Sequence, residues 1–401
     1  MALFKQLILS GVMASAFALP SMAQTSSVAG GQSGYDETLE AISPTDEPVR
    51  VGLAGEDPAD IGRYILAANG GVGGGSLSPD GETIAFSWSI TGERQLWTIP
   101  ATGGQPTRLT YGNGISFYRW APDGEHLIYG ADNDGDEQEA YFLISADGTS
   151  EEIIFPAQPG AFRTFGDFLP EGDGIIYTST ARTNLHFDIY KAAIPNGEPE
   201  MIYEDEFGVY VGAVSPDGKY VNFSTTVGED SDNLYMLDIE SGDVTTVSEP
   251  ERRASQGGIT WKDDSTGFYF VSNMEREYQA IQYYDVESGF TSMIASDDQA
   301  DMGSLRLCGA DDRYLAWTRN VGGYSVIHVE DRVEDTMLDV PELPEGAYGL
   351  SCNEEDPRIV IGVNGWRTPG SFVTWDLDTG EVHDTFIAPM AGLDPERLVR
   401  P

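Results

Sequence analysis

A four-residue turn motif that recurs along the chain is the feature that most constrains its fold. Ser78-Pro79-Asp80-Gly81 returns as Ala121-Pro122-Asp123-Gly124 and as Ser215-Pro216-Asp217-Gly218. Proline presets φ at the second position of a turn, aspartate bonds to the nearby backbone, and glycine accepts a positive φ. A β-rich segment follows each copy, such as Thr83–Trp88 after the first. The motif therefore predicts a strand–turn–strand unit that is repeated along the chain.

Degenerate copies of this turn extend the repeat to seven. The turns are 43 to 48 residues apart and begin at Ser78, Ala121, Leu169, Ser215, Lys262, Gly309 and Asn353. Each copy continues into a third hydrophobic strand and, after a further turn, into a short fourth strand. Four antiparallel strands in roughly 45 residues, repeated in series, are typical of a β-propeller blade. We therefore expect an all-β fold, a seven-bladed β-propeller of four-stranded antiparallel blades, over residues 57–388.

Strand order assigns the loops of such blades to two faces. If the strands of a blade are A to D, the A–B and C–D turns lie on one face and the B–C and D–A connections on the other. The B–C segments are the longer and more variable ones, at 131–139, 179–187, 225–232 and 272–278. Variable loops on a rigid scaffold usually carry binding, so we expect function on the B–C face.

The start of the chain predicts export. Residues 1–23 have a positive residue, an apolar stretch and the small-x-small pattern Ser21-Met22-Ala23, and are interpreted as a signal peptide. We expect a periplasmic or extracellular protein. Residues 24–56 are interpreted as a flexible segment. No later run of 18 apolar residues predicts membrane insertion.

Shorter segments flank the predicted blades. A helix is predicted within Asp57–Ala68, with Ile61, Tyr64, Ile65 and Leu66 as its apolar side. The glycine-rich run Gly70–Gly75 is interpreted as a flexible lead-in to the first blade. Residues 389–401 are interpreted as a linker-like tail.

The chain is strongly acidic. It has 66 acidic and 22 basic residues and a formal net charge of −44. Such a surface repels nucleic acid and anionic lipid, so neither is an expected partner. Because the acidic residues are spread through the loops, solubility is the favoured explanation, and attraction of cationic ligands is the alternative.

The most acidic loop supplies the candidate binding residues, namely Asp132, Asp134, Asp136, Glu137 and Glu139. The EF-hand pattern fails there, because Glu137 stands where glycine is needed and Leu143 where a bidentate glutamate should be. A solvated hairpin loop is the favoured interpretation, and docking of a partner or of an amine is the alternative. The four histidines are scattered at positions 126, 186, 328 and 383, and no G-x-S-x-G motif occurs. We therefore predict no metal, no cofactor and no catalytic residue in this chain.

The two cysteines occupy equivalent positions of the sixth and seventh repeats, 44 residues apart. Cys308 and Cys352 follow the same apolar pattern as Leu77, Trp120 and Val214 in other repeats. Two buried free thiols are one interpretation. A disulfide between the innermost strands is the other, and it requires Cα atoms closer than about 7 Å.

Several segments together resemble the N-terminal propeller of the prolyl oligopeptidase family of serine peptidases, especially its acylaminoacyl-peptidase-like branch. The resemblance rests on Leu96–Gly104 with Arg108-Leu109-Thr110, Asp132–Gln138, Ser179–Tyr190, Asn320–Ser325, Trp375–Glu381 and Leu393–Leu398. In that family an α/β-hydrolase domain carries the catalytic serine, aspartate and histidine, and the propeller gates access to them. Acidic propeller residues hold the substrate's amino terminus in some members, which makes Asp136 and Glu137 candidates.

Two functions follow from this resemblance. The first is a non-catalytic gating propeller of a secreted peptidase, because the chain stops at Pro401, where the hydrolase domain would begin. Its partners would be a peptide substrate and a hydrolase domain or partner protein. The alternative is a stand-alone periplasmic scaffold that binds a protein or ligand, similar to Tol-associated propellers.

Overall fold

Hydrophobic segments between tight turns form 28 strands in the computed structural model, which describes residues 61–353 and 355–400. The predicted signal peptide at 1–23 and the predicted flexible segment at 24–56 lie outside the described residues. Within the described residues, the helix α3 (Ile61–Gly70) precedes the strands, and two short 3₁₀ helices, η1 (Ala310–Asp312) and η2 (Pro395–Arg397), occur later. No helix among the described residues is long and apolar enough to cross a membrane.

The strands follow one another in seven groups of four. The first two groups are β1 (Val72–Leu77), β2 (Thr83–Trp88), β3 (Gln95–Pro100) and β4 (Thr107–Arg108), then β5 (Phe117–Trp120), β6 (His126–Ala131), β7 (Ala140–Ser145) and β8 (Glu151–Phe155). The next two are β9 (Arg163–Phe168), β10 (Gly174–Ser179), β11 (Asp188–Ala193) and β12 (Glu200–Tyr203), then β13 (Val209–Val214), β14 (Tyr220–Gly228), β15 (Ser231–Asp238) and β16 (Val244–Ser248). The last three are β17 (Gln256–Trp261), β18 (Gly267–Ser272), β19 (Ala280–Asp285) and β20 (Thr291–Ala295), then β21 (Met302–Cys308), β22 (Tyr314–Val321), β23 (Tyr324–Asp331) and β24 (Thr336–Met337), then β25 (Ala347–Cys352), β26 (Arg358–Asn364), β27 (Ser371–Asp376) and β28 (Val382–Phe386).

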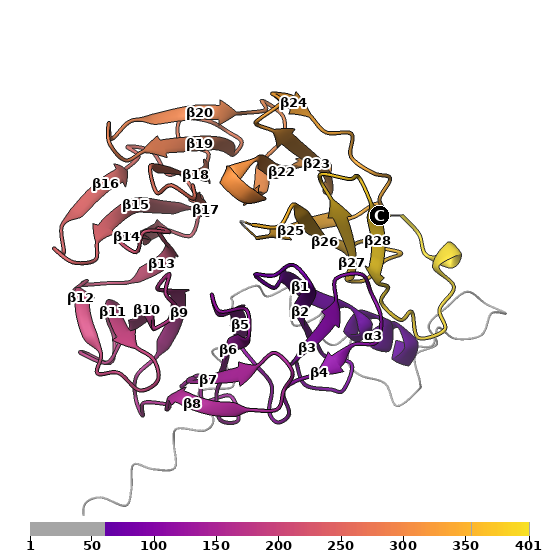
Figure 1. The fold of residues 1–401 in the computed structure, drawn as a ribbon, viewed down its shortest axis with the longest axis horizontal. Coiled ribbons are helices and arrows are strands. Elements are labelled where there is room, and N and C mark those ends of the chain that lie inside the picture. Colours follow the sequence, from indigo (N-terminus) through magenta and orange to yellow (C-terminus); the bar gives the residue numbers. More distant parts are fainter. Residues whose placement is uncertain (1–60, 354, 401) are drawn as a thin grey trace, which may run out of the picture. The chain divides into compact units, whose positions relative to one another are not determined.

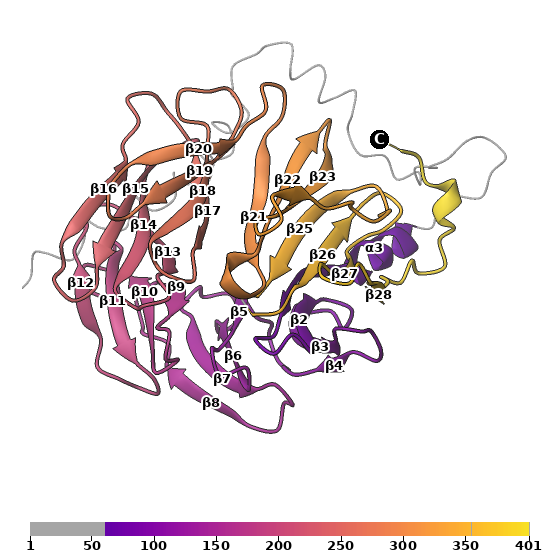
Figure 2. The ribbon, with the colours of Figure 1, turned by 45° about the horizontal axis from the view of Figure 1, so that its top comes forward.

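Each group is one antiparallel sheet with its strands in chain order. Figure 1 shows the seven sheets around a common axis, with the first strand of each blade innermost and the fourth outermost. The prediction of a seven-bladed propeller with four-stranded blades is confirmed. Figure 2 shows the blades from an oblique angle.

The core lies between neighbouring blades and not inside any one of them. The middle strands of each blade contribute fully buried side chains; Ile84 in β2 and Ile175 in β10, for example, are 0% exposed. One cluster joins Ile128 and Tyr141 of the second blade to Ile175 and Tyr177 of the third. A blade therefore cannot bury its apolar faces without its neighbours, and the ring is stabilised as a whole.

The ring closes by packing of the seventh blade against the first. Phe86 of β2 contacts Phe372 of β27 edge to face, with ring centroids 5.5 Å apart. Across the same junction the Val72 N–H donates to Gly370 O at 3.2 Å, and the Thr385 hydroxyl donates to Ala101 O at 2.9 Å. Among the described strands, none is exchanged between these two blades, because each blade is built from one contiguous segment.

Two predictions about the lead-in to the first blade need correction. The glycine-rich run is not a flexible lead-in, because β1 begins at Val72 and includes most of it. A Cβ atom at Gly75 would lie 3.0 Å from the Phe372 ring, and one at Gly71 would lie 2.6 Å from Pro369 O. These glycines therefore let β1 approach the seventh blade closely.

The predicted helix exists, but it continues to Gly70 and its packing differs from expectation; the predicted start at 57–60 lies outside the described residues. It spans Ile61–Gly70, and its apolar side chains are exposed, from 47% at Tyr64 to 58% at Leu66. Ala67 and Gly70 are buried, and Gly70 lies against Pro389. The small residues of this helix form its close contacts with the rest of the structure, and the larger apolar side chains face outward.

Candidate functional site

The recurrent Pro-Asp-Gly turns have a structural role. Asp80 Oδ1 accepts a hydrogen bond from the Ser78 hydroxyl at 2.5 Å and from the Glu82 N–H at 3.0 Å. These bonds, that of Ser78 first, lower the pKa of Asp80. Because the motif's side chains are used within the turn, they are not free to bind a ligand.

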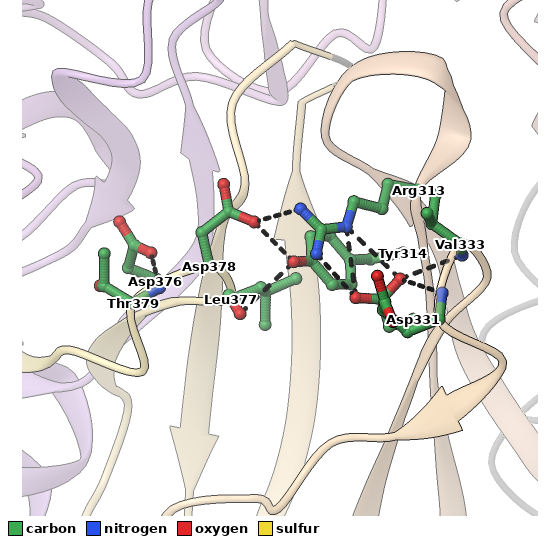
Figure 3. A network of polar contacts seen from close by, with 9 residues as sticks. Arg313, Tyr314, Asp331, Val333, Asp376, Leu377, Asp378 and Thr379 are labelled. Carbon is green, nitrogen blue, oxygen red and sulfur yellow. Dashed lines mark hydrogen bonds and ion pairs between the residues drawn. The ribbon is translucent and has the colours of Figure 1, made fainter.

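A polar network on the same face joins the sixth and seventh blades (Figure 3). Arg313 contacts Asp331 Oδ2 through Nη2 and Asp378 Oδ1 through Nη1, both at 2.8 Å. The Tyr314 hydroxyl donates to Asp378 Oδ1 at 2.6 Å. The Arg313 hydrogen bond lowers the pKa of Asp331, while burial, with the bond to Asp378, raises the pKa of Tyr314. The network holds the two blades together.

The two cysteines lie at the same junction. Cys308 and Cys352 form a disulfide between β21 and β25, with Cα atoms 5.6 Å apart. The bridge joins the innermost strands of the sixth and seventh blades. Together with the ion pair of Arg313 with Asp378, it cross-links these two blades.

The acidic loop at 132–139 connects β6 to β7 and therefore lies on the B–C face. Two of its five candidate residues are used internally: Asp132 accepts from the Gly135 and Glu137 N–H groups, and Asp136 from the Asn133 and Gln138 N–H groups. Asp134 accepts from Asn113 at 2.7 Å. Among the described residues Glu137 has no ion-pair partner, so it is the candidate carboxylate most available to a ligand.

Glu139, the fifth candidate, is half-buried. Burial raises its pKa, while a hydrogen bond from Ser116 and the charge of Arg163 lower it. Arg163 is the first residue of the innermost strand β9, and its guanidinium lies 5.2 Å from the centre of the Tyr141 ring. Glu139 thus belongs to the inner edge of the B–C face, and the five acidic residues do not converge on one point.

A second acidic site on this face was missed by the sequence analysis. A recess of about 200 Å³ in the fifth blade is lined by Glu275, Arg276, Glu277, Tyr278, Asp297 and Asp298. Arg276 donates to Asp298 Oδ1 at 3.3 Å, and Arg319 pairs with Asp297 at 3.3 Å. Within the described part of the chain, Glu275 and Glu277 have no ion-pair partner. The signal for this recess was Glu275-Arg276-Glu277 on the B–C connection and Asp297-Asp298 on the D–A connection of one blade.

An arginine in the third blade is held by two acidic side chains. Arg182 donates to both carboxylate oxygens of the fully buried Asp188 at 2.8 Å and pairs with Glu204 at 3.0 Å. The Asp205 N–H also donates to Asp188. This clamp orders the third B–C loop, and no motif in the sequence predicts it.

The donor set gives no support for a metal centre. Among the described residues, no group of three or more histidine, cysteine, aspartate or glutamate side chains is placed to hold a metal ion. In the second blade, His126 bonds to Asp123 at 2.8 Å. In the sixth blade, His328 stacks on Trp317. Burial lowers the pKa of His328.

The comparisons with known proteins agree with this geometry. Residues 204–316 match the family model of the prolyl oligopeptidase N-terminal beta-propeller domain. Dipeptidyl aminopeptidase BIII of Pseudoxanthomonas mexicana is 24% identical over 350 residues, which are 82% of this chain and 48% of that protein. This chain thus spans about half the length of that relative. An uncharacterised protein of Agrobacterium fabrum, Atu1656, is 25% identical over 235 residues, 55% of this chain and 76% of that protein. A solved prolyl endopeptidase superposes with a TM-score of 0.65 at 16% identity, over 84% of this chain and 53% of the other.

Proposed function

Because this chain carries the N-terminal propeller domain of the prolyl oligopeptidase family, we propose that it controls substrate access in a peptidase of that family. The family match over 204–316 is the observation that carries the proposal. The catalytic serine, aspartate and histidine would come from a hydrolase domain or a partner protein. The contribution of this chain is then a rigid ring and a binding face, without a chemical step of its own.

The ring geometry supports a gating role. Its blades bury their faces only against one another, and a disulfide and an ion-pair network fix the junction of the sixth and seventh blades. We propose that a ring held in this way admits extended peptides and excludes folded proteins. Access is then set by substrate size.

The acidic B–C face supports peptides with a free amino terminus as the substrate class. Glu137 and the recess with Glu275 and Glu277 present carboxylates that can pair with an ammonium group. The name of the relative from Pseudoxanthomonas mexicana, a dipeptidyl aminopeptidase, points to the same substrate class.

Export to the periplasm or to the cell exterior is part of the proposal. Two observations support it: the leader-like residues 1–23 and the pairing of both cysteines in a disulfide. Disulfides persist mainly in oxidising compartments.

The test is capture with a biotinylated fluorophosphonate, which labels the active serine of serine hydrolases. An extract of the producing cells is labelled, and captured proteins are searched for peptides of this chain. If this chain is captured from an extract that was denatured after labelling, the propeller and the active serine belong to one polypeptide. If it is captured only from a native extract, the two belong to a complex. Both results support the proposal. Pretreatment with unlabelled fluorophosphonate must abolish recovery. Absence of this chain from both captures, when it is abundant in the extract, contradicts the proposal.

One observation favours a second candidate, a stand-alone binding scaffold. The match to Atu1656 covers 76% of that protein, so the similarity is not restricted to relatives twice the length of this chain. A scaffold of this kind would use the same acidic face for a cationic partner. The fluorophosphonate experiment separates the two functions, because a scaffold is not captured.

A further inference from the structure

Three ionisable side chains lie at one level of the innermost strands. Register defines the level: Arg119 of β5 pairs with Ile128, Asp167 of β9 with Ile176, and Arg306 of β21 with Ala316. Each partner is a buried residue of the second strand of its blade. Uncharged residues occupy the same register in other blades, namely Ser76, Thr260 and Ser351. Two guanidinium groups and one carboxylate thus share this level.

The side chains flanking each arginine point backward into the preceding blade. Tyr118 donates to Ala85 O, and the Trp120 indole N–H donates to Ser76 O, both in the first blade. Leu305 and Leu307 pack in one cluster with residues of the fifth blade. Because side chains alternate along a strand, the side chains of Arg119 and Arg306 point away from the preceding blade.

The two arginines are close enough to sense one another although they belong to the second and sixth blades. Burial, and then the charge of Arg119, lowers the pKa of Arg306. The charge of Arg119 also acts on Asp167, whose pKa burial raises to about 6. Since the second and sixth blades are not neighbours, this coupling acts across the ring axis, around which the innermost strands lie (Figure 1).

Neither arginine has a carboxylate partner among the described residues. Arg119 donates to Tyr118 O at 2.8 Å, and Arg306 donates to Leu305 O at 2.6 Å, each within its own strand. Each guanidinium has five N–H donors, so most of these donors have no protein acceptor. This is unexpected in a chain with three times as many acidic as basic residues. By contrast, Arg182 and Arg313 are each held by two carboxylates.

Asp167 does not act as the missing counter-ion. Its Oδ1 accepts from the Phe168 N–H at 2.9 Å, and its Oδ2 accepts from the Val214 N–H at 3.0 Å. The carboxylate thus clips the third blade to the fourth and forms no ion pair with either arginine. Two positive charges that repel one another within the ring therefore remain available to an anion.

We propose that Arg119 and Arg306 form an oxyanion subsite on the ring axis, which takes a carboxylate or a phosphate group. The planar guanidinium donates two parallel hydrogen bonds to either group, and an anion between the two arginines offsets their repulsion. The carboxylate can come from a peptide terminus or from an acidic side chain, and the phosphate from inorganic phosphate. The subsite depends only on this chain's own residues and does not rest on the function proposed above.

The experiment is isothermal titration calorimetry at constant ionic strength with three probes: inorganic phosphate, N-acetyl-trialanine with a free carboxylate, and its C-terminal amide. We expect the wild-type chain to bind phosphate, the peptide acid, or both, but not the amide. A phosphate-only result identifies a free-anion site, and tighter binding of the peptide acid identifies a peptide site.

Substitutions locate the binding. R119Q and R306Q should each weaken it about tenfold to a hundredfold, since hydrogen bonds to charged groups contribute on that scale. R253Q is the matched control, because Arg253 pairs with Asp230 on the exposed surface, and it should bind like the wild type. Circular dichroism verifies that each variant folds. If R306Q does not fold, R119Q decides the test, because Arg119 is exposed and its substitution leaves the core intact. Binding of none of the probes by the wild type, or unchanged binding by R119Q, overturns the proposal.

Discussion

The disulfide between Cys308 and Cys352 gives the most quantitative prediction. Its removal, by reduction of the wild-type chain or by C308A/C352A, should lower the free energy of unfolding. Cross-linking residues 44 positions apart removes chain entropy from the unfolded state, and the loop-closure relation gives about 4 kcal/mol for that length. Because reduction leaves the packing atoms in place, while alanine removes buried sulfur, the reduced wild-type chain is the cleaner measure.

The assay is urea unfolding followed by tryptophan fluorescence, with and without reductant, after thiol titration has verified each redox state. Amide hydrogen exchange locates the loss of stability along the chain. Protection should fall most in β21 and β25, which the bridge joins, and less in β9 and β13 across the ring. The C308A/C352A variant should not respond to reductant. A loss below about 1 kcal/mol on reduction would refute the chain-entropy reasoning. An equal loss of protection in all blades would refute the view that the bridge acts at one junction.

Three further predictions follow from the structure. R182A should destabilise the fold by about 3–5 kcal/mol in urea unfolding, because it leaves the fully buried Asp188 carboxylate uncompensated; a change below 1 kcal/mol would contradict this. G75V should cost about 1–3 kcal/mol, because its side chain would meet the seventh blade, whereas G349A, with open space around its Cβ position, should be nearly neutral. Burial raises the pKa of Asp167 from 3.8 to about 6, so its contribution is fully present below the lower value and is lost as pH rises through the higher one. The stability of the wild type relative to D167N should therefore fall by up to about 2–3 kcal/mol between about pH 4 and pH 7, and a flat difference would contradict the sign.

The blades could be predicted from sequence because their signals are local. A Pro-Asp-Gly turn and the alternation of the strands around it are encoded within a dozen residues, and the copy at Ser78 forms the bonds that its chemistry implies. Packing between blades is not local. Gly75 looked like part of a flexible run, and only the position of the Phe372 ring against it explains why a glycine stands there.

The candidate sites show the same limit. The residue types of the acidic loop were clear, but whether a carboxylate faces a ligand or its own backbone depends on hydrogen-bond geometry, and Asp132 and Asp136 face the backbone. The charged level escaped detection because the A–B connection of the sixth blade is one residue longer: Arg306 pairs with Ala316, ten residues later, whereas Asp167 pairs with Ile176, nine residues later. Asp167 lies two residues before the start of its turn at Leu169, but Arg306 lies three residues before Gly309, so spacing alone does not align them.

The central claim, that this propeller sets access by substrate size, is tested most directly with the fluorophosphonate-reactive assembly that contains this chain. The measurement is kcat/KM for one cleavable sequence, first as a short peptide with a free amino terminus and then in a loop of a folded protein. An unfolded form of that protein serves as the control for sequence context. The account predicts cleavage of the short peptide and no detectable cleavage of the folded protein. Comparable kcat/KM values for the short peptide and the folded protein would contradict it.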